Sequence, residues 1–542
     1  MANLLHKNGE AGIFHMGQPR FFRQRILTQA ASLEAKGLFN YLVSEIKRRR
    51  EVSLEEAILI ARDVEQYLEG NLLKRACGQI EFPAIAGRDN HKKRAREDQP
   101  ERLIKLTVVA EEDIELLAEF GVVGLQVGRL ARVIEEAYFQ DAILDYPRLV
   151  VLFLETHKGL RHHLEGLWQE GVLLPVAGMK KESRSLMKGL RAGVAIERYL
   201  EGEDLTEVRK RLGISMSRWQ RWWQDFKEVA RQEDKSPEEL SSLLGEPKEL
   251  VGALREAWKK HKDRRGVLEL VGFEKGASET SKRSSFGRTS PKAFYELLCQ
   301  RHGYSPAAAE AFLDELYEIA ARLNRQERAL GQIVYNAVAD HEPAGRRLIE
   351  CEMRPVVLDY VAPEDFELAN RDSQEGLKWA RLTRLVTQAR NQGVALTQPD
   401  LSLLLGISTA AIKSLLDRHP NVILPTRGVV ADMGPALSHA DKIIRLFMDG
   451  YTETEIVRRT GHTYESVERY LLDFSKMVYL VERGMPVPAI RKVLGFSRRL
   501  VQKYVGLYEE FCGPDYIFMM AKIRRMAQAH PVDPVKKNGK GV

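Results

Sequence analysis

The stretch Ala110-Glu111-Glu112-Asp113-Ile114-Glu115-Leu116 returns near the middle of the chain as Ala362-Pro363-Glu364-Asp365-Phe366-Glu367-Leu368. Other segments keep nearly the same shift of about 250 positions. They are Gly78-Gln79-Ile80 with Gly331-Gln332-Ile333, Arg129-Leu130 and Arg132 with Arg381-Leu382 and Arg384, and 219–226 with 467–474. Self-similarity at a fixed distance indicates an internal duplication. The chain therefore carries two copies of one module, and two related surfaces suit a twofold or tandem partner such as duplex DNA.

The composition predicts an ordinary soluble, cytoplasmic protein. The 542 residues are 44% hydrophobic and 29% charged, and the four cysteines form no CxxC pair. There is no apolar run near the roughly 18 residues needed to span a bilayer, and no signal-peptide core at the start. The net charge of +7 and the pI of about 9.0 favour a polyanionic partner. We expect localisation with the nucleoid, no membrane association, no cofactor and no bound metal.

Changes in composition along the chain predict five segments. They are a leader (1–31), copy one (32–262), a basic flexible linker (263–289), copy two (290–513) and a basic C-terminal tail (514–542). Apolar residues recur at spacings of three and four through both copies, which predicts a mainly helical fold. Short strands are expected only at 103–109, 355–361 and 422–425.

Each copy contains three successive segments with the pattern of a helix-turn-helix unit. In the first unit of copy two, residues 399–416, Gly406 can take the positive φ of a tight turn and Ser408 can cap the second helix. Its inner face is apolar, so Thr409 and Lys413 are expected to point outward, toward a DNA major groove. The other two units of copy two span 454–471 and 489–504. Their predicted DNA-contacting residues are Arg458, Arg459, His462, Tyr464, Glu465, Arg469, Arg498, Arg499 and Lys503.

Residues 422–430 follow the first unit and resemble the wing of a winged helix. Two short apolar stretches flank a Pro-Thr-Arg-Gly tip, so Arg427 is expected at a phosphate or the minor groove. The alternative is a surface hairpin with an incidental arginine, and the sequence does not distinguish the two.

Copy one keeps the same scaffold with weaker DNA-binding features. Its second unit, residues 205–223, is intact and basic, and Arg218 and Arg221 are its predicted DNA contacts. Its third unit places Glu246 and Glu249 where copy two is basic, which opposes phosphate approach. In its first unit Leu154 stands at the position of Gly406, which argues against the same turn. Copy one is therefore expected to be partly structural.

Structural roles account for several other residues that could also have a function. Trp219, Trp222 and Trp223 could stack on bases, but their helical spacing favours core packing. Asp113 and Asp365 could belong to a nuclease site, but each follows a strand and precedes an apolar-periodic run, which favours a helix start. His462 is more simply an exposed turn residue. No nucleotide-binding, hydrolase or metalloprotease motif is present, so we expect no enzyme activity.

Four stretches of copy two resemble a known family: 424–428, 434–439, 458–462 and 468–474. The chain is similar to uncharacterised bacterial and archaeal proteins grouped as a domain of unknown function with tandem helix-turn-helix segments. The resemblance covers about 350–510, and copy one lacks the Gly-Pro-x-x-Ser-His element. It implies a DNA-binding or regulatory role and no established activity.

Together these features predict a sequence-specific double-stranded DNA-binding protein, a transcriptional regulator acting as a covalent pseudo-dimer. Two alternatives stay open: a DNA-recognition component of a mobile element, and a helical scaffold that binds protein partners or a second copy of the chain.

Overall fold

The computed structural model describes residues 33, 38–50, 52–73, 75–87, 100–264, 267, 270, 290–325, 328–342, 351–371, 374–419, 422, 424–430, 436–460, 464–496 and 498–529. The predicted leader and nearly all of the predicted linker lie outside these residues.

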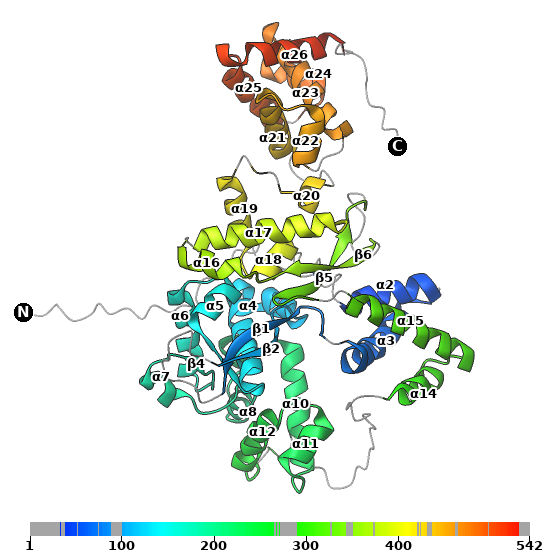
Figure 1. Cartoon of the computed structure of the whole chain (residues 1–542), viewed down its shortest axis with the longest axis vertical. Coiled ribbons are helices and arrows are strands. Elements are labelled where there is room, and N and C mark those ends of the chain that lie inside the picture. Colours follow the sequence, from blue (N-terminus) through cyan, green and yellow to red (C-terminus); the bar gives the residue numbers. More distant parts are fainter. Residues whose placement is uncertain are drawn as a thin grey trace, which may run out of the picture.

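The fold is mainly helical, as predicted, and it also contains two small sheets (Figure 1). Copy one contains α2 (Leu38–Arg50), α3 (Leu54–Tyr67), the short π-helix Leu68–Leu72, β1 (Gln79–Ala86), β2 (Glu101–Thr107), α4 (Glu112–Phe139), β3 (Ala142–Asp145), α5 (Tyr146–Phe153), α6 (His157–Gln169), β4 (Val176–Ala177), α7 (Lys181–Leu186), α8 (Arg191–Leu200), α9 (Leu205–Leu212), α10 (Met216–Arg231), α11 (Pro237–Leu244) and α12 (Lys248–His261). Copy two contains α14 (Pro291–Arg301), α15 (Pro306–Arg325), β5 (Gln332–Ala339), β6 (Met353–Asp359), α16 (Glu364–Arg371), α17 (Gln374–Asn391), β7 (Val394–Ala395), α18 (Gln398–Leu405), α19 (Thr409–Arg418), α20 (Arg427–Val430), α21 (Ala436–Met448), α22 (Glu453–Thr460), α23 (Tyr464–Glu482), α24 (Val487–Leu494), α25 (Arg498–Phe511), the 3-10 turn Pro514–Tyr516 and α26 (Ile517–Ala529).

The two sheets repeat one pattern. β1 pairs antiparallel with β2 and β3, and β5 pairs antiparallel with β6 and β7. The strands predicted at 103–109 and 355–361 are confirmed as β2 and β6. Their partners β1 and β5 were not predicted. The expectation of strands rested on short apolar runs, whereas both of these strands begin within the repeated Gly-Gln-Ile segment.

The repeated glycines join the two copies. The Gly78 backbone N–H donates to the Val334 carbonyl at 3.1 Å, and the Gly331 N–H donates to the Glu81 carbonyl at 2.9 Å. Both glycines have positive φ, and a Cβ on either would lie about 2 Å from a carbonyl oxygen, that of Val109 or Val361. Only glycine fits such a close backbone approach. The two copies therefore contact each other through equivalent glycines, each of which donates a hydrogen bond to the other copy.

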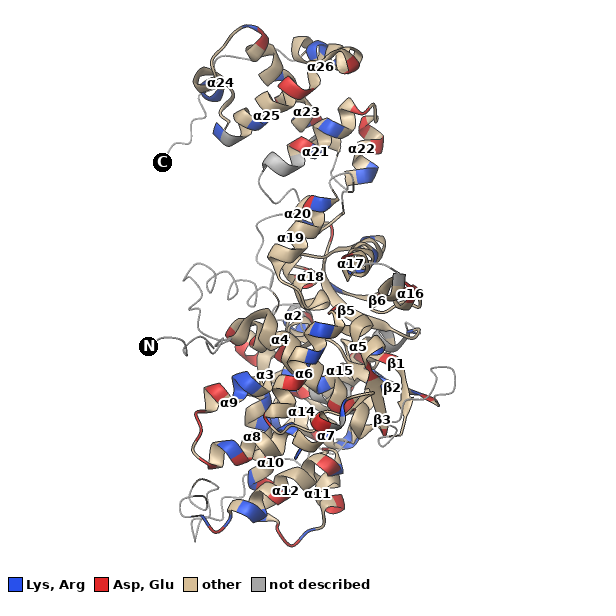
Figure 2. Ribbon diagram, turned by 90° about the vertical axis from the view of Figure 1, so that its left-hand side faces the viewer, with Lys and Arg blue, Asp and Glu red and all other residues tan. Residues whose placement is uncertain are grey.

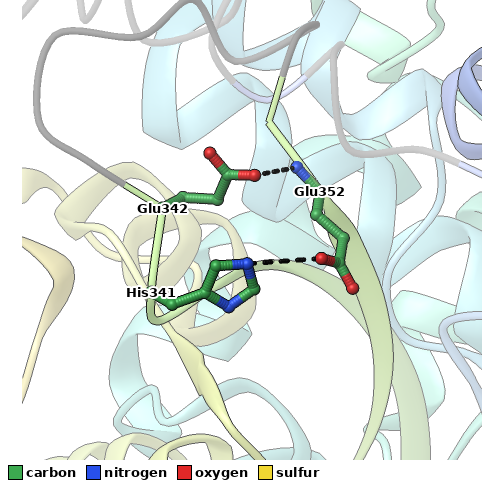
Figure 3. Close-up of side chains that lie close together, drawn as sticks. All are labelled: His341, Glu342 and Glu352. Carbon is green, nitrogen blue, oxygen red and sulfur yellow. Dashed lines mark hydrogen bonds and ion pairs between the residues drawn. The ribbon is translucent and has the colours of Figure 1, made fainter.

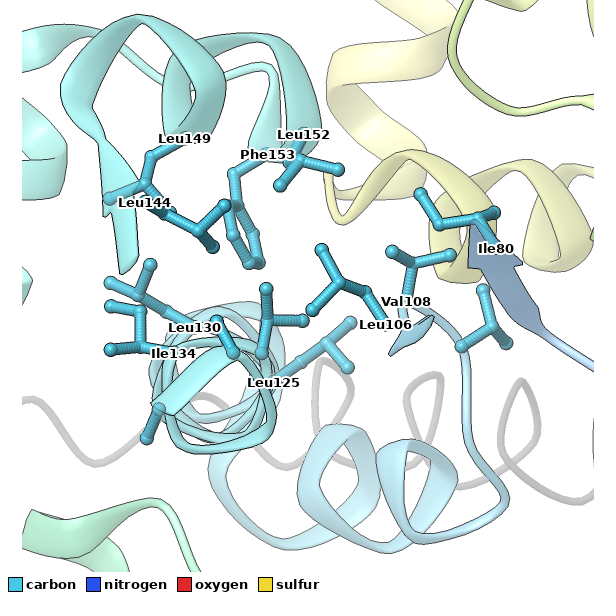
Figure 4. Close-up of a cluster of buried hydrophobic side chains, with 14 of the residues drawn as sticks. Ile80, Leu106, Val108, Leu125, Leu130, Ile134, Leu144, Leu149, Leu152 and Phe153 are labelled. Carbon is cyan, nitrogen blue, oxygen red and sulfur yellow. The ribbon is translucent and has the colours of Figure 1, made fainter. Parts of the chain in front are cut away.

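The copies share two hydrophobic cores. In the smaller one α2 and α3 pack with α14 and α15, and the Tyr67 ring stacks on Phe294 with centroids 4.1 Å apart. The larger core combines residues of both copies around the sheets and the long helices. Figure 4 shows its copy-one part, where the strand residues Ile80 and Leu106 face Leu130 of α4 and Phe153 of α5.

A buried ion-pair cluster marks the start of each long helical segment, which confirms the predicted helix-start role of the two aspartates. Asp113 accepts hydrogen bonds from the Ala110 N–H at 3.0 Å, from Arg129 at 2.9 Å and from Arg132 at 2.7 Å. In copy two Asp365 accepts from the Ala362 N–H at 3.1 Å and from Arg381 and Arg384, each at 2.8 Å. Both aspartates are fully buried.

Each long helix also holds the end of a short helix in the other copy. Arg381, which is fully buried, donates to the Val151 carbonyl at 2.8 Å at the end of α5. Reciprocally, the Gln126 amide of α4 donates to the Gly406 carbonyl at 3.0 Å, just after α18. The first helix pair of each copy is thus clamped at its turn by the opposite copy.

The turn between α5 and α6 corrects an expectation. Leu154 was expected to disrupt the turn, but it adopts the left-handed conformation itself (φ 52°, ψ 34°). A non-glycine residue there is strained by about 1 kcal/mol or more. The Leu154 side chain is 1% exposed in the large core, and that burial offsets the strain. Copy one therefore keeps the turn without glycine.

Helices α21–α26 form a separate core, which Figure 1 shows at the far end of the molecule. Residues 517–529 were expected to belong to the tail. They form α26, whose Met520 and Ile523 are buried in this core because they align on one helix face. We call α21–α26 the C-terminal array.

The prediction of a β wing at residues 422–430 is wrong. Residues 427–430 form the one-turn helix α20, and 422 and 424–426 are not in a strand. The Arg427 side chain is buried at 3% exposure, and its backbone N–H donates to the Leu396 carbonyl at 2.8 Å. The segment therefore packs against the end of β7 instead of projecting.

No single helix among the described residues is both long and apolar enough to cross a membrane. The bent pair α18 and α19 passes that test only when its two helices are taken together.

Candidate nucleic-acid interface

The first corner of copy two has the predicted local geometry but a different exposure. Gly406 takes φ +65°, Ser408 caps α19 by accepting the Ala411 N–H at 3.1 Å, and the two helices meet at 103°. Lys413 is exposed as predicted. Thr409 is only 8% exposed, so its predicted outward position is wrong. A first-turn residue faces inward here because the corner packs against the rest of the core.

The second corner presents two exposed arginines at the end of α22, Arg458 and Arg459. The Arg459 guanidinium lies over the Tyr451 ring at 4.1 Å, and the exposed Arg469 lies over Tyr470 at 5.2 Å. Tyr464 opens α23 and is half exposed, and its hydroxyl donates to Glu453. His462 and the side chain of Glu465 lie outside the described residues.

The third corner also carries exposed positive charge. Gly495 takes φ +72° between α24 and α25. Arg491, Lys492 and Arg498 are exposed around it, and none has an ion pair with any residue that the structure describes. Figure 2 shows their basic segments at the adjoining ends of the two helices. We call these three residues the corner cations.

Two other residues predicted for this corner behave differently. Lys503 was expected to face DNA, but its ammonium pairs with Asp441 of α21 at 3.0 Å. The side chain of Arg499 lies outside the described residues. Arg491 and Lys492 were not among the predicted residues, although both are exposed beside the same turn. Their position in the last turn before the turn glycine could have identified them, because that turn borders the second helix.

In copy one the equivalent second helix is docked against its own module, which corrects the prediction for Arg218. Arg218 pairs with Glu112 at 2.8 Å, and the Ser217 N–H donates to Glu115 at 3.0 Å. Burial alone would raise the pKa of Glu112, but Arg218 and Arg132 outweigh it and hold the pKa well below its usual value.

Arg221 is similarly engaged, because it pairs with the buried Glu246 at 2.8 Å. Of the two predicted DNA contacts of copy one, Arg218 is therefore held within the fold, whereas Arg221 is exposed and forms an ion pair. The three tryptophans follow the core interpretation: Trp219 and Trp222 are buried, and Trp223 is partly buried.

Small residues allow this docking in copy one. Gly128 of α4 lies against Gly213, and a Cβ on Gly128 would stand 2.8 Å from the Gly213 carbonyl oxygen. Arg191 bridges the contact, pairing with Glu135 at 2.9 Å and donating to the Gly128 carbonyl.

By the shifts of the repeat, copy two has Ala380 in place of Gly128, Thr387 in place of Glu135 and Ser466 in place of Arg218. The steric space and the charge pairs that dock copy one are thus missing from copy two, whose array forms its own core.

Replacing Gly128 with alanine is expected to lower the free energy of unfolding of the shared core by about 1–3 kcal/mol, because the added methyl overpacks a backbone contact. The matched control is Gly166→Ala in α6. A Cβ there meets nothing within 4 Å, so about 0.5–1 kcal/mol of stabilisation is expected. Thermal unfolding followed by calorimetry measures both. Equal midpoints for the two variants would contradict the docking argument.

One group of potential metal ligands lies at the end of the β5–β6 hairpin, where Figure 3 shows His341, Glu342 and Glu352. The His341 imidazole lies 3.3 Å from a Glu352 oxygen, and Glu342 accepts the Glu352 backbone N–H at 2.8 Å. These contacts close the hairpin and explain the arrangement structurally.

These features define a class: a duplicated, mainly helical protein whose copies share their cores and whose C-terminal helical array stands apart. The chain belongs to the family described as Protein of unknown function (DUF1670), whose model matches residues 50–256 and again 304–507. The double match agrees with the internal duplication and with the resemblance drawn from the sequence. No curated protein and no solved structure matches the chain.

Proposed function

We propose that the protein binds double-stranded DNA sequence-specifically through its C-terminal array and acts as a transcriptional regulator. The shared cores of the two copies serve as the platform that carries the array. In this proposal copy one contributes structure, because its equivalent cations are held in ion pairs.

The observation that carries the proposal is the third corner. Three exposed cations surround a left-handed glycine turn, and none has an ion pair with the described residues. Long basic side chains left without carboxylate partners on one corner are the charge pattern of a phosphate-binding surface. The whole array, residues 436–529, has 15 Lys and Arg against 11 Asp and Glu, so this local excess is not balanced elsewhere in it.

The helix arrangement supports a division of roles. In a helix-turn-helix unit the first helix lies across the phosphate backbone, and the second enters the major groove with its N-terminal residues. Arg491 and Lys492 end α24, so they are assigned to phosphates. Arg498 begins α25, so it is assigned to base edges or the adjoining phosphate. Arg458 and Arg459 take the phosphate role at the second corner.

The test is a binding series with the full chain on genomic DNA fragments at increasing salt. Five phosphate contacts predict that log K falls against log salt with a slope of about −4 to −5. Selected fragments should bind about 10³-fold or more tightly than unselected DNA. A chain that binds no DNA at about 50 mM salt, or binds with a slope near zero, would overturn the proposal.

A further inference from the structure

A pocket of about 470 Å³ lies in the C-terminal array, and its lining includes none of the corner cations. It is formed where the end of α21, the start of α22, the first residue of α23 and the middle of α26 meet. The hollow is open to solvent on one side, and its volume falls in the range of about 300–1,000 Å³ found for small-molecule sites. Its lining combines ring surface with positive charge.

The ring surface comes from three aromatic residues, one on α21, one in the loop after α21 and one on α23. Phe447 is almost fully buried at the end of α21, Tyr451 is partly buried, and Tyr464 is half exposed. Met526 of α26 adds a polarizable thioether to the wall. Aromatic and thioether groups together favour contact with a flat ring.

The charge comes from α26. Lys522 and Arg525 line the pocket, both are exposed, and neither has an ion pair with any residue in the described part of the chain. The carboxylate in the lining, Glu453, already accepts the Tyr464 hydroxyl. That hydrogen bond raises the pKa of Tyr464, so the phenol stays protonated and keeps donating. Positive charge therefore exceeds negative charge in the lining.

We propose that this pocket binds a small aromatic anion. The ring of the ligand lies against Phe447 and Tyr451, and its carboxylate or phosphate is held by Lys522 and Arg525. Arg525 can hold either group with two parallel N–H bonds, and Lys522 adds a point charge. The site is distinct from the corner cations, and its test uses no DNA.

The experiment is a calorimetric titration of the full chain with two anionic probes, indole-3-acetate and AMP. Their neutral analogues, indole-3-acetamide and adenosine, are titrated in parallel. One anionic probe should bind with 1:1 stoichiometry and a Kd below about 10 mM. Its neutral analogue should bind about tenfold more weakly or worse, because the charge-assisted bonds are lost. The two probes distinguish a carboxylate ligand from a nucleotide.

The variant Arg525→Gln should weaken binding of that probe about tenfold or more. Arg524→Gln is the matched control, because Arg524 is on the same helix, pairs with Glu482 at 2.8 Å and does not line the pocket. The control should bind the probe as the unaltered chain does. The proposal is overturned if neither anion saturates, if the neutral analogues bind equally well, or if Arg524→Gln weakens binding as much as Arg525→Gln.

Discussion

Replacing the three corner cations together, Arg491→Gln, Lys492→Gln and Arg498→Gln, is expected to lower DNA affinity on the order of 10²–10³-fold at about 0.1 M salt. Each phosphate contact releases condensed counterions, so the loss of three contacts also flattens the salt slope by about 2.7. The change should be similar for all DNA sequences if the three residues contact phosphates alone. A loss concentrated on selected fragments would place Arg498 on base edges.

The matched control removes the same charge from copy one. Arg231 of α10, Lys259 of α12 and Lys262 just after α12 are cations of copy one, and each pairs with a nearby glutamate. Changing all three to glutamine alters the net charge equally but should change DNA affinity less than about threefold, because more distant charges are screened. Fluorescence anisotropy with labelled duplex measures both triple variants. If the copy-one variant loses as much affinity, the effect is one of net charge and the corner is not the contact.

The second large effect concerns stability. Asp365→Asn is expected to lower the free energy of unfolding by about 3–5 kcal/mol, because it removes the anion from a buried cluster with two arginines. Arg381 is fully buried, and without the carboxylate its neighbours are mainly the carbonyls of Val151 and Leu152. An amide cannot neutralise that charge. The clamp between the copies should loosen at the same time.

Calorimetry can localise this effect, because the C-terminal array has its own core. Asp365→Asn should shift the transition of the shared cores and leave that of the array unchanged. The adjacent Glu364→Gln is the control, since Glu364 is exposed and should change stability by less than about 1 kcal/mol. Equal shifts for the two variants would show that the cluster contributes little to stability.

Local rules account for the parts of the fold that could be predicted. The turns at Gly406 and Gly495 follow from the low cost of positive φ at glycine, and the cap at Ser408 follows from a hydroxyl next to free backbone N–H groups. These rules failed to predict the turn at Leu154, because burial of its side chain in the core offsets the backbone strain. They also failed to predict β1 and β5, because the glycine contacts that position these strands join the two copies and are not local.

The candidate site was only partly predictable for the same reason. Arg458, Arg459 and Arg498 are exposed as expected, whereas Arg427 and Thr409 are buried. Whether such a side chain is exposed depends on elements packed over it, and a single helix pattern does not contain that information.

The order of residues alone establishes the duplication, the helical character and the positions of the glycine corners, because each depends on neighbours a few positions apart or on direct repetition. It does not establish which copy offers free positive charge. That depends on contacts such as the pair of Arg218 with Glu112, which are 106 positions apart. Folding brings such groups together in copy one. Copy two has Ala380 and Ser466 at the equivalent positions, so it lacks this contact and its array forms a separate body.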